Sequence, residues 1–186
     1  MPHNFHRVPS TSLVALGAAI ALNWQCFAGT VATDTPPPAG VTLLETEQFA
    51  NPGGWELDTQ SMDVMGSPYL LAHGLGVPVR DAVTTARFAT PGSVRVWVRT
   101  RDWVAPWKVP GAPGKFQVLV DGKALATTFG TEGADWHWQD GGVISVGAQA
   151  QVALHDLTGF EGRCDALLFS PDLAFTPPHE LSLIHI

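Results

Sequence analysis

Four tryptophans are the residues of this chain whose type and spacing are best suited to binding a ligand. Trp103 and Trp107 are four residues apart in the proline-rich segment 99–116, and Trp136 and Trp138 flank a histidine. Proline restricts the conformations open to a segment, so the two rings of 99–116 can be held in place. A fixed indole face packs well against the C–H bonds of a sugar ring. The sequence therefore predicts Trp103, Trp107, Trp136 and Trp138 as ligand-binding residues.

A second interpretation of the same tryptophans is structural. Large aromatic side chains usually pack in a core or anchor a loop. In an extended segment the indoles of Trp136 and Trp138 share one side and His137 faces the other. If all four rings lie close together, they form one exposed patch, which usually marks a partner surface. That partner is either a polysaccharide or another domain of the same protein, and the sequence does not choose between them.

No complete catalytic constellation is present in the sequence. His155 and Asp156 are the right residue types for nucleophilic catalysis, but as strand neighbours they point to opposite faces. The G-x-S-x-G motif that carries a nucleophilic serine is absent, and no pair of carboxylates stands out for glycosidase chemistry. Tyr69 is the only tyrosine that could serve a polysaccharide lyase. We therefore predict no catalytic residues, and a stand-alone polysaccharide lyase remains the alternative.

The charge balance argues against a nucleic-acid partner. The chain has a formal net charge of −7, and Lys and Arg form no cluster beyond the alternating arginines of 95–101. Nucleic-acid binding needs clustered cations that displace counterions from phosphates. We expect no nucleic-acid partner.

Both ends of the chain read as segments outside the folded module. Residues 1–32 contain a short apolar run, 13–22, followed by small residues, which is typical of a secretory signal peptide. The run is too short to cross a bilayer, so we expect a secreted or periplasmic protein with no membrane span. Residues 33–40 form a Pro-rich linker, and 177–186 combine a truncated linker with a tail, LSLIHI, that resembles a translated sequencing adaptor.

The segment between these ends has the pattern of an all-β protein. Residues 94–99 alternate valines with Arg and Trp, and Asp121-Gly122 separates two strand-like runs, 116–120 and 123–128, as in a hairpin. Weaker strands are predicted at 41–47, 55–58, 69–73, 82–88, 136–139, 143–146, 151–156 and 165–170. Many short strands punctuated by Gly and Pro predict an antiparallel β-sandwich of jelly-roll type over residues 41–176.

The final strand should be covered on both faces, because both of its alternating sets of side chains are apolar. Strict alternation places Cys164 with Ala166 and Leu168, opposite to Asp165. Cys26 lies in the predicted signal peptide, which leaves Cys164 without a disulfide partner. We expect Cys164 to be a small buried hydrophobic residue.

Several stretches resemble known secreted proteins. The strand "VRVWVRT", the hairpin "FQVLVDGKAL" and the closing "VALHDLTGFEGRCDALLFS" follow the order seen in galactose-binding-like modules, including carbohydrate-binding modules. The stretches "RDWVAPWKVPGAPGKF" and "FGTEGADWHWQDGG" resemble the amino-terminal module of secreted FAD-dependent oxidoreductases, some labelled xanthan lyase. The resemblance implies a non-catalytic, carbohydrate-binding-like fragment of such an oxidoreductase, with a xanthan-lyase-like enzyme as the alternative.

The flavin itself is expected only in a missing downstream domain. A flavin-binding fingerprint is G-x-G-x-x-G at the start of a helix. In this chain Gly74-Leu75-Gly76 is followed by Val77-Pro78, so the third glycine is missing and a proline opposes the helix. We expect no FAD in this fragment, and we expect polysaccharide or the missing carboxy-terminal catalytic domain as its partner.

The same resemblance implies a structural calcium ion. Related sugar-binding sandwiches hold calcium with acidic residues of their first and last strands, and Glu45, Glu47 and Asp165 match these positions. Calcium binds six to eight oxygen ligands, including backbone carbonyls that a sequence does not reveal. The alternative, favoured by spacing alone, places Glu45 and Glu47 on one solvated face.

Overall fold

The computed structural model describes residues 39–178. The predicted signal peptide, the linker except Ala39 and Gly40, and residues 179–186 lie outside the described residues. Among the described residues, no helix combines the length and the apolar character needed to cross a membrane.

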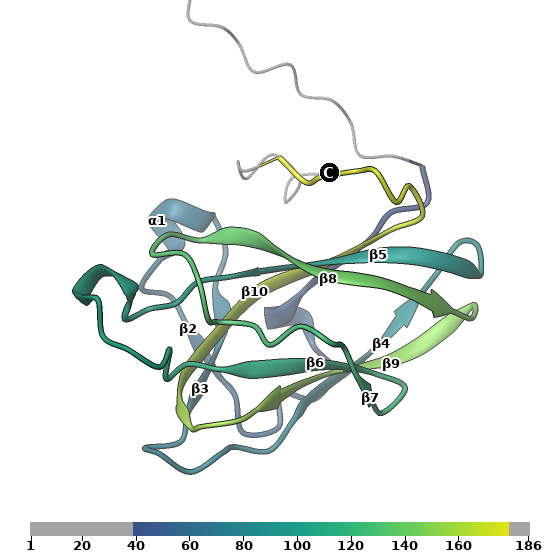
Figure 1. Ribbon diagram of the computed structural model, residues 1–186. Helices are drawn as coiled ribbons and strands as arrows, with labels where there is room; N and C mark the ends of the chain where they lie inside the picture. The colour runs from purple at the N-terminus through teal and green to yellow at the C-terminus, as the bar shows by residue number, and fades with distance from the viewer. Residues whose placement is uncertain (1–38, 179–186) are drawn as a thin grey trace, which may run out of the picture. The chain divides into compact units, whose positions relative to one another are not determined.

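Two antiparallel sheets form this module (Figure 1). Along the chain, the strands and short helices follow in this order: β1 (Thr42–Glu45), η1 (Thr46–Gln48), β2 (Glu56–Asp58), α1 (Met62–Met65), β3 (Tyr69–His73), β4 (Ala82–Arg87), β5 (Gly92–Thr100), η2 (Ala105–Trp107), β6 (Phe116–Val120), β7 (Lys123–Ala124), β8 (His137–Val146), β9 (Gln149–Asp156) and β10 (Phe160–Ser170). The larger sheet has the order β2-β3-β10-β5-β8, with β1 also paired to β10, and the smaller has the order β4-β9-β6-β7. The predicted all-β, antiparallel class is confirmed.

The main core lies between the two sheets. Alternate residues of β5 point into it, as the valine pattern of 94–99 predicts, and meet alternate residues of β6, β9 and β10. The fully buried members with the largest side chains are Phe116, Phe129, Phe169, Leu70, Leu154, Leu167, Val96, Val98 and Val118. Burying side chains of this size stabilises the fold by roughly 1.5 to 3 kcal/mol each.

The predicted hairpin is present. Asp121 and Gly122 both have positive φ, 50° and 76°, as a two-residue turn between right-twisted strands requires. The second strand is shorter than the predicted 123–128, since β7 contains only Lys123 and Ala124. Leu125 continues the contact by donating its backbone N–H to Val118.

The predicted strands 136–139 and 143–146 are one strand, β8, and this part of the prediction is wrong. The glycines 141 and 142 suggested a break, but they form an irregularity within the pairing of β8 with β5. Gly142 has φ +84° and donates its N–H to the Asp140 carboxylate at 2.8 Å. The extra residue bends the strand without ending it.

A second irregularity corrects the predicted partners of Cys164. The pairing of β10 with β5 shifts between Cys164 and Ala166, so Asp165 is an additional residue that reverses the alternation. Cys164 therefore packs in the core with Leu167 and Phe169, not with Ala166 and Leu168. The strand is covered on both faces, as predicted, and Cys164 is buried.

Candidate functional site

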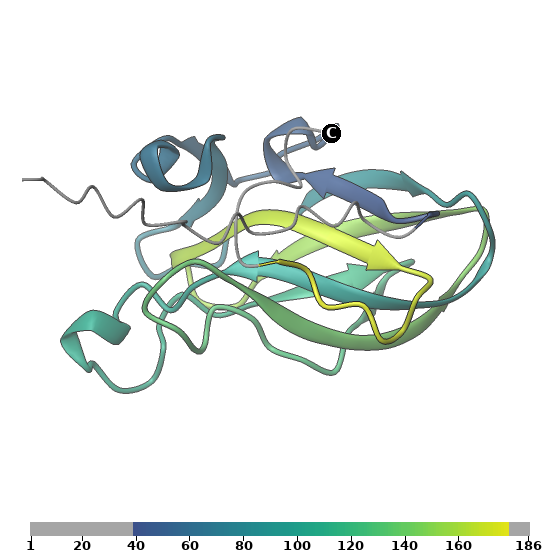
Figure 2. The same ribbon diagram turned by 90° about the horizontal axis from the view of Figure 1, so that it is seen from above.

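Three connections meet at one end of the module, which we name the three-loop end. They are the β3–β4 loop (74–81), the β5–β6 loop (101–115) and the β9–β10 turn (157–159) with Phe160. Leu157 donates its N–H to the Lys115 carbonyl, and the Thr158 hydroxyl donates to the Pro113 carbonyl. Figure 2 shows the helical turn η2 of the β5–β6 loop projecting beyond the ends of the strands. Backbone contacts thus hold loops that are distant in sequence side by side.

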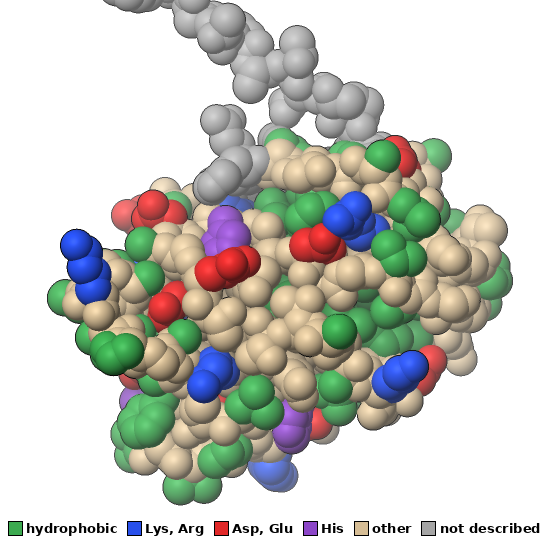
Figure 3. Space-filling model, viewed as in Figure 1, with side chains coloured by type: hydrophobic (Ala, Val, Ile, Leu, Met, Phe, Trp, Pro, Cys, Tyr) green, Lys and Arg blue, Asp and Glu red, His purple; other side chains and the backbone are tan. Residues whose placement is uncertain are grey.

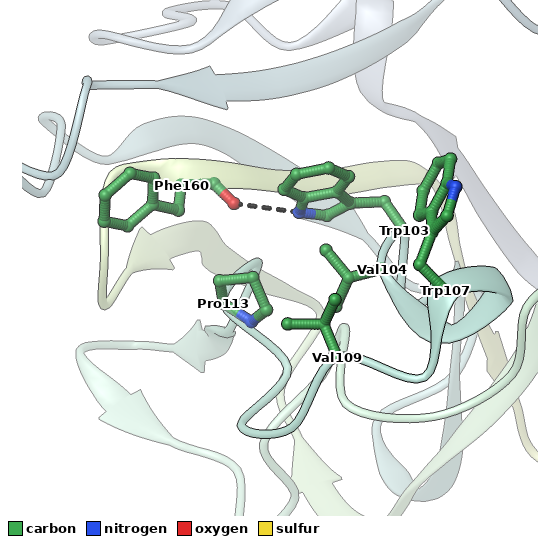
Figure 4. A pocket seen from close by; sticks show the side chains of 6 residues that line it. All are labelled: Trp103, Val104, Trp107, Val109, Pro113 and Phe160. Atoms are coloured by element: carbon green, nitrogen blue, oxygen red, sulfur yellow. Dashed lines mark hydrogen bonds between the residues drawn. The ribbon is translucent and has the colours of Figure 1, made fainter.

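An apolar hollow of about 480 Å³ opens at this end. It is lined by Trp103, Val104, Trp107, Val109, Pro113 and Phe160 (Figure 4). Five of these residues belong to the β5–β6 loop, and Phe160 faces them from the start of β10. The sequence identified Trp103 and Trp107 but not the other four.

Trp103 forms a fixed wall of the hollow. Its indole N–H donates to the Phe160 carbonyl at 3.1 Å (Figure 4), and the Arg163 guanidinium lies 5.3 Å from its ring centroid. Gly114 also lies against this ring, since a Cβ built there would be 2.9 Å from Trp103 Cδ1. A hydrogen bond, a cation–π contact and a glycine therefore determine the position of this ring.

Trp107 provides the accessible ring. Its side chain is 68% exposed, and its ring meets Trp103 edge-on with centroids 6.3 Å apart and planes at 69°. Pro106 lies in η2, and Lys108 ends this turn in the left-handed region with φ 55°. The short turn thus presents Trp107 to solvent beside a buried neighbour, Val104.

The other two predicted tryptophans lie elsewhere. Trp136 is buried, 4% exposed, and its ring meets Tyr69 edge-on with ring centroids 4.8 Å apart. Trp138 is half-buried in the cluster of Trp97 and Leu168 on the outer face of the larger sheet. The four rings therefore do not form one patch, and burial leaves Trp136 no face for a ligand.

Three titratable side chains, His73, Glu161 and Arg163, lie in contact behind Trp103. Glu161 contacts His73 Nδ1 at 3.2 Å through one oxygen and Arg163 Nη2 at 2.8 Å through the other. Glu161 has φ 60°, a left-handed conformation that non-glycine residues seldom adopt. This backbone conformation places Glu161 between His73 and Arg163, and no residue pattern in the sequence signals it.

Apolar side chains continue beyond the hollow along the β3–β4 loop. Leu75 is 80% and Val77 is 69% exposed, and Gly76 between them lies against the ring of Phe160. Figure 3 shows hydrophobic side chains gathered over this end of the module, at the lower left. Exposed apolar groups of this extent usually mark an interaction surface.

The predicted metal ligands come together at a different place, where β1 meets β10. Glu45 pairs with Ala166, next to Asp165, and Glu47 follows in η1. Asp165 lies 3.5 Å from Arg99 Nη1 and accepts a hydrogen bond from Ser67 at 3.4 Å. The expectation that Glu45 and Glu47 lie on a solvated face fails, because oxygens of both side chains are buried.

Burial changes the acidity of these carboxyl groups. Loss of solvent, reinforced by the charges of Asp165 and Glu47, raises the pKa of Glu45 to about 8, and Arg99 opposes this. Burial likewise raises the pKa of Asp165 to about 7 against the opposing charge of Arg99. Three carboxylates and one guanidinium leave an excess of two negative charges when all are ionised.

These residues fit a hard divalent cation by their chemistry. Both oxygens of Glu45, one of Glu47 and one of Asp165 are buried without a hydrogen-bond partner among the described residues. Carboxylate oxygens are the ligands that calcium prefers. However, within residues 39–178 no three His, Cys, Asp or Glu side chains are arranged closely enough to hold a metal ion together. The calcium site stays a prediction.

Comparisons with known proteins identify the fold. No family model matches the chain, and no curated protein matches it by sequence. Among solved structures, the chain is similar to a GH26-CBM35 β-(1,4)-mannanase from Podospora anserina, with a TM-score of 0.56 and 18% identity over 76% of this chain. It is also similar to a family 35 carbohydrate-binding module from Clostridium thermocellum, with a TM-score of 0.53 and 15% identity over 70% of this chain. The jelly-roll β-sandwich of carbohydrate-binding modules is therefore the fold of this chain.

The two similar structures differ in the share of their own length that this chain covers. This chain covers 29% of the Podospora mannanase and 98% of the Clostridium module. The similarity thus corresponds to one module of the larger enzyme.

Proposed function

We propose that this chain is a non-catalytic module that binds polysaccharide at the three-loop end. The observation that carries this proposal is the exposed ring of Trp107 beside the braced ring of Trp103 in an apolar hollow. Fixed aromatic rings bind the C–H faces of sugars with little loss of conformational freedom. The fold shared with carbohydrate-binding modules supports the proposal.

The alternative of a stand-alone polysaccharide lyase is less well supported. Tyr69, the only tyrosine of the chain, is 1% exposed, and burial raises the pKa of its hydroxyl. A buried hydroxyl that stays protonated can neither reach a polymer nor act as its general base. His155 contacts Asp81 at 2.8 Å, whereas Asp156 is buried and accepts hydrogen bonds from backbone N–H groups of Val79, Thr158 and Gly159. Asp156 therefore has a structural role.

Docking of a catalytic domain at the three-loop end is the second candidate function. It is favoured by the six lining residues of the hollow, all of which are apolar. The buried centre of an interface is likewise enriched in apolar and aromatic residues. A binding experiment separates the two functions, because docking alone gives no affinity for polysaccharide.

Replacement of Trp107 by alanine tests polysaccharide binding. The expected result is about tenfold weaker binding to the polysaccharide that the wild type binds, about 1.4 kcal/mol. Affinity electrophoresis measures this for a soluble polymer, and depletion of the protein from solution measures it for an insoluble one. The melting temperature should stay unchanged because Trp107 is mostly exposed. Val143→Ala, at an exposed apolar side chain of β8, is the control and should bind as the wild type does. Absence of wild-type binding to every polysaccharide tested would overturn the proposal.

We also propose that Glu45, Glu47 and Asp165 hold a structural calcium ion, which requires their side chains to draw closer together than they lie in this structure. The ion would neutralise the excess negative charge at the junction of β1 and β10. It would also be coordinated by the buried carboxylate oxygens that have no hydrogen-bond partner. Calcium should therefore raise the melting temperature, and Glu47→Gln should reduce that increase. Glu56→Gln, at an exposed acid of β2, serves as the control. Identical melting curves in calcium and in chelator would contradict the proposal.

The parent protein is proposed from the sequence resemblance alone. We infer a secreted FAD-dependent oxidoreductase associated with polysaccharide degradation, with the flavin in a domain that follows this module. The genomic sequence beyond Glu180 tests this: a strand followed by G-x-G-x-x-G and a helix is expected. A stop codon directly after the module would overturn it.

A further inference from the structure

The lining of the hollow constrains the kind of polysaccharide that it can take, and this step rests on the proposed function. Sites for individual sugars or small molecules combine apolar walls with a few polar groups that fix orientation. Here every lining residue is apolar, and the indole N–H of Trp103 already donates to the Phe160 carbonyl. A free sugar pressed against this surface would lose hydrogen bonds to water without replacement, which is costly.

Three charged groups near the hollow, Glu161, Arg163 and Asp102, are already engaged, whereas Lys108 is exposed beside Trp107. Both oxygens of Glu161 are engaged by His73 and Arg163, and the guanidinium of Arg163 lies over Trp103. Asp102 is buried and accepts the backbone N–H of Val104. The six lining side chains themselves are uncharged, so an uncharged surface is their electrostatic complement.

The apolar surface is also longer than the hollow. It continues from Phe160 over Gly76 to Leu75 and Val77. Three non-glycine residues of the loops that carry it, Leu75, Lys108 and Ala112, adopt positive φ. Non-glycine residues adopt this conformation only where the surrounding structure imposes it.

We propose that the three-loop end binds the face of an ordered, uncharged polysaccharide, in which neighbouring chains satisfy the sugar hydroxyls and leave C–H groups exposed. Such a face offers apolar area without unsatisfied polar groups, which matches Trp107, Phe160 and Val77. The surface therefore discriminates against soluble oligosaccharides of the same sugars.

Depletion of the protein from solution by insoluble crystalline cellulose, chitin and mannan tests the proposal. We expect binding to at least one of these solids, unchanged between 0.05 and 0.5 M NaCl. The soluble hexasaccharide of the same sugar should bind at least tenfold more weakly in calorimetry. Val77→Ser should reduce the bound fraction severalfold, whereas Leu57→Ser, at a comparably exposed position on β2, should not.

Other outcomes overturn this inference or the function itself. Binding of the hexasaccharide as tightly as the solid would overturn the inference and leave polysaccharide binding intact. Binding only to anionic polymers, lost in high salt and in Lys108→Gln, would show that the exposed lysine beside Trp107 selects a charged ligand, and would also overturn it. Failure to bind any solid or soluble polysaccharide would overturn the proposed function as well.

Discussion

At the scale of single residues, Gly114 determines where Trp103 lies. A Cβ at this position would be 2.9 Å from Trp103 Cδ1 and 3.0 Å from the Glu161 carbonyl oxygen. Separations this short require the ring or the backbone to move. The shape of the hollow thus depends on a residue that does not line it.

Gly114→Ala should therefore displace Trp103 and weaken polysaccharide binding about as much as Trp107→Ala. The expected signature is a shift in tryptophan fluorescence together with a several-fold loss of affinity, because Trp103 would lose its hydrogen bond to Phe160. Gly147→Ala is the control, since its Cβ would meet only Gln149 O at 3.6 Å. Unchanged fluorescence and affinity in Gly114→Ala would show that the ring adjusts at no cost.

Residue types alone predicted part of this site. Trp103 and Trp107 stand out because they are close in sequence and large enough to bind a sugar. Phe160 and Gly114 did not, because their contact with Trp103 depends on how the β5–β6 loop meets the β9–β10 turn. Such contacts between distant segments have no local pattern in the sequence.

At the scale of elements, two irregularities in the larger sheet decide which side chains face the core. Alternation of apolar residues predicted β5 closely, because every second side chain of a regular strand has the same environment. It failed at Asp165 in β10 and at the glycine pair in β8, where one extra residue changes the pairing. Bulges are determined by the partner strand, so a single strand's pattern does not reveal them.

Gly142→Ala tests the irregularity in β8. Its φ of +84° is strained for alanine, although no atom lies within 4 Å of the position of the added Cβ. The free energy of unfolding in urea should therefore fall by about 1 to 2 kcal/mol from backbone strain alone. Gly147→Ala again provides the comparison, and an equal effect in both variants would argue against strain as the cause.

At the scale of the whole module, stability should depend on pH through the carboxyl groups of Glu45 and Asp165. Their pKa values are raised to about 8 and about 7 in the folded state, from ordinary values of 4.5 and 3.8. The folded state therefore binds these protons more tightly than the unfolded state does. Their contribution to stability is fully present below about pH 4 and is lost as the pH rises to about 8.

In chelator, the melting temperature should fall by about 5 °C or more between pH 5 and pH 8. Calcium should oppose this fall, because a cation favours the ionised carboxylates. Differential scanning calorimetry across this pH range, with and without calcium, measures both effects. A melting temperature independent of pH in chelator would show that these carboxyl groups titrate normally.

The bracing of Trp103 has a consequence for how the module would meet the proposed polysaccharide. Before anything binds, its indole N–H already donates to the Phe160 carbonyl, Gly114 lies against one side of the ring, and the Arg163 guanidinium lies over it. Capture then requires little rearrangement, so encounter frequency rather than a slow structural adjustment would set the association rate. A change in the backbone of the turn at Phe160 would therefore weaken binding even if Trp103 and Trp107 were both retained, because the Trp103 indole would lose its acceptor.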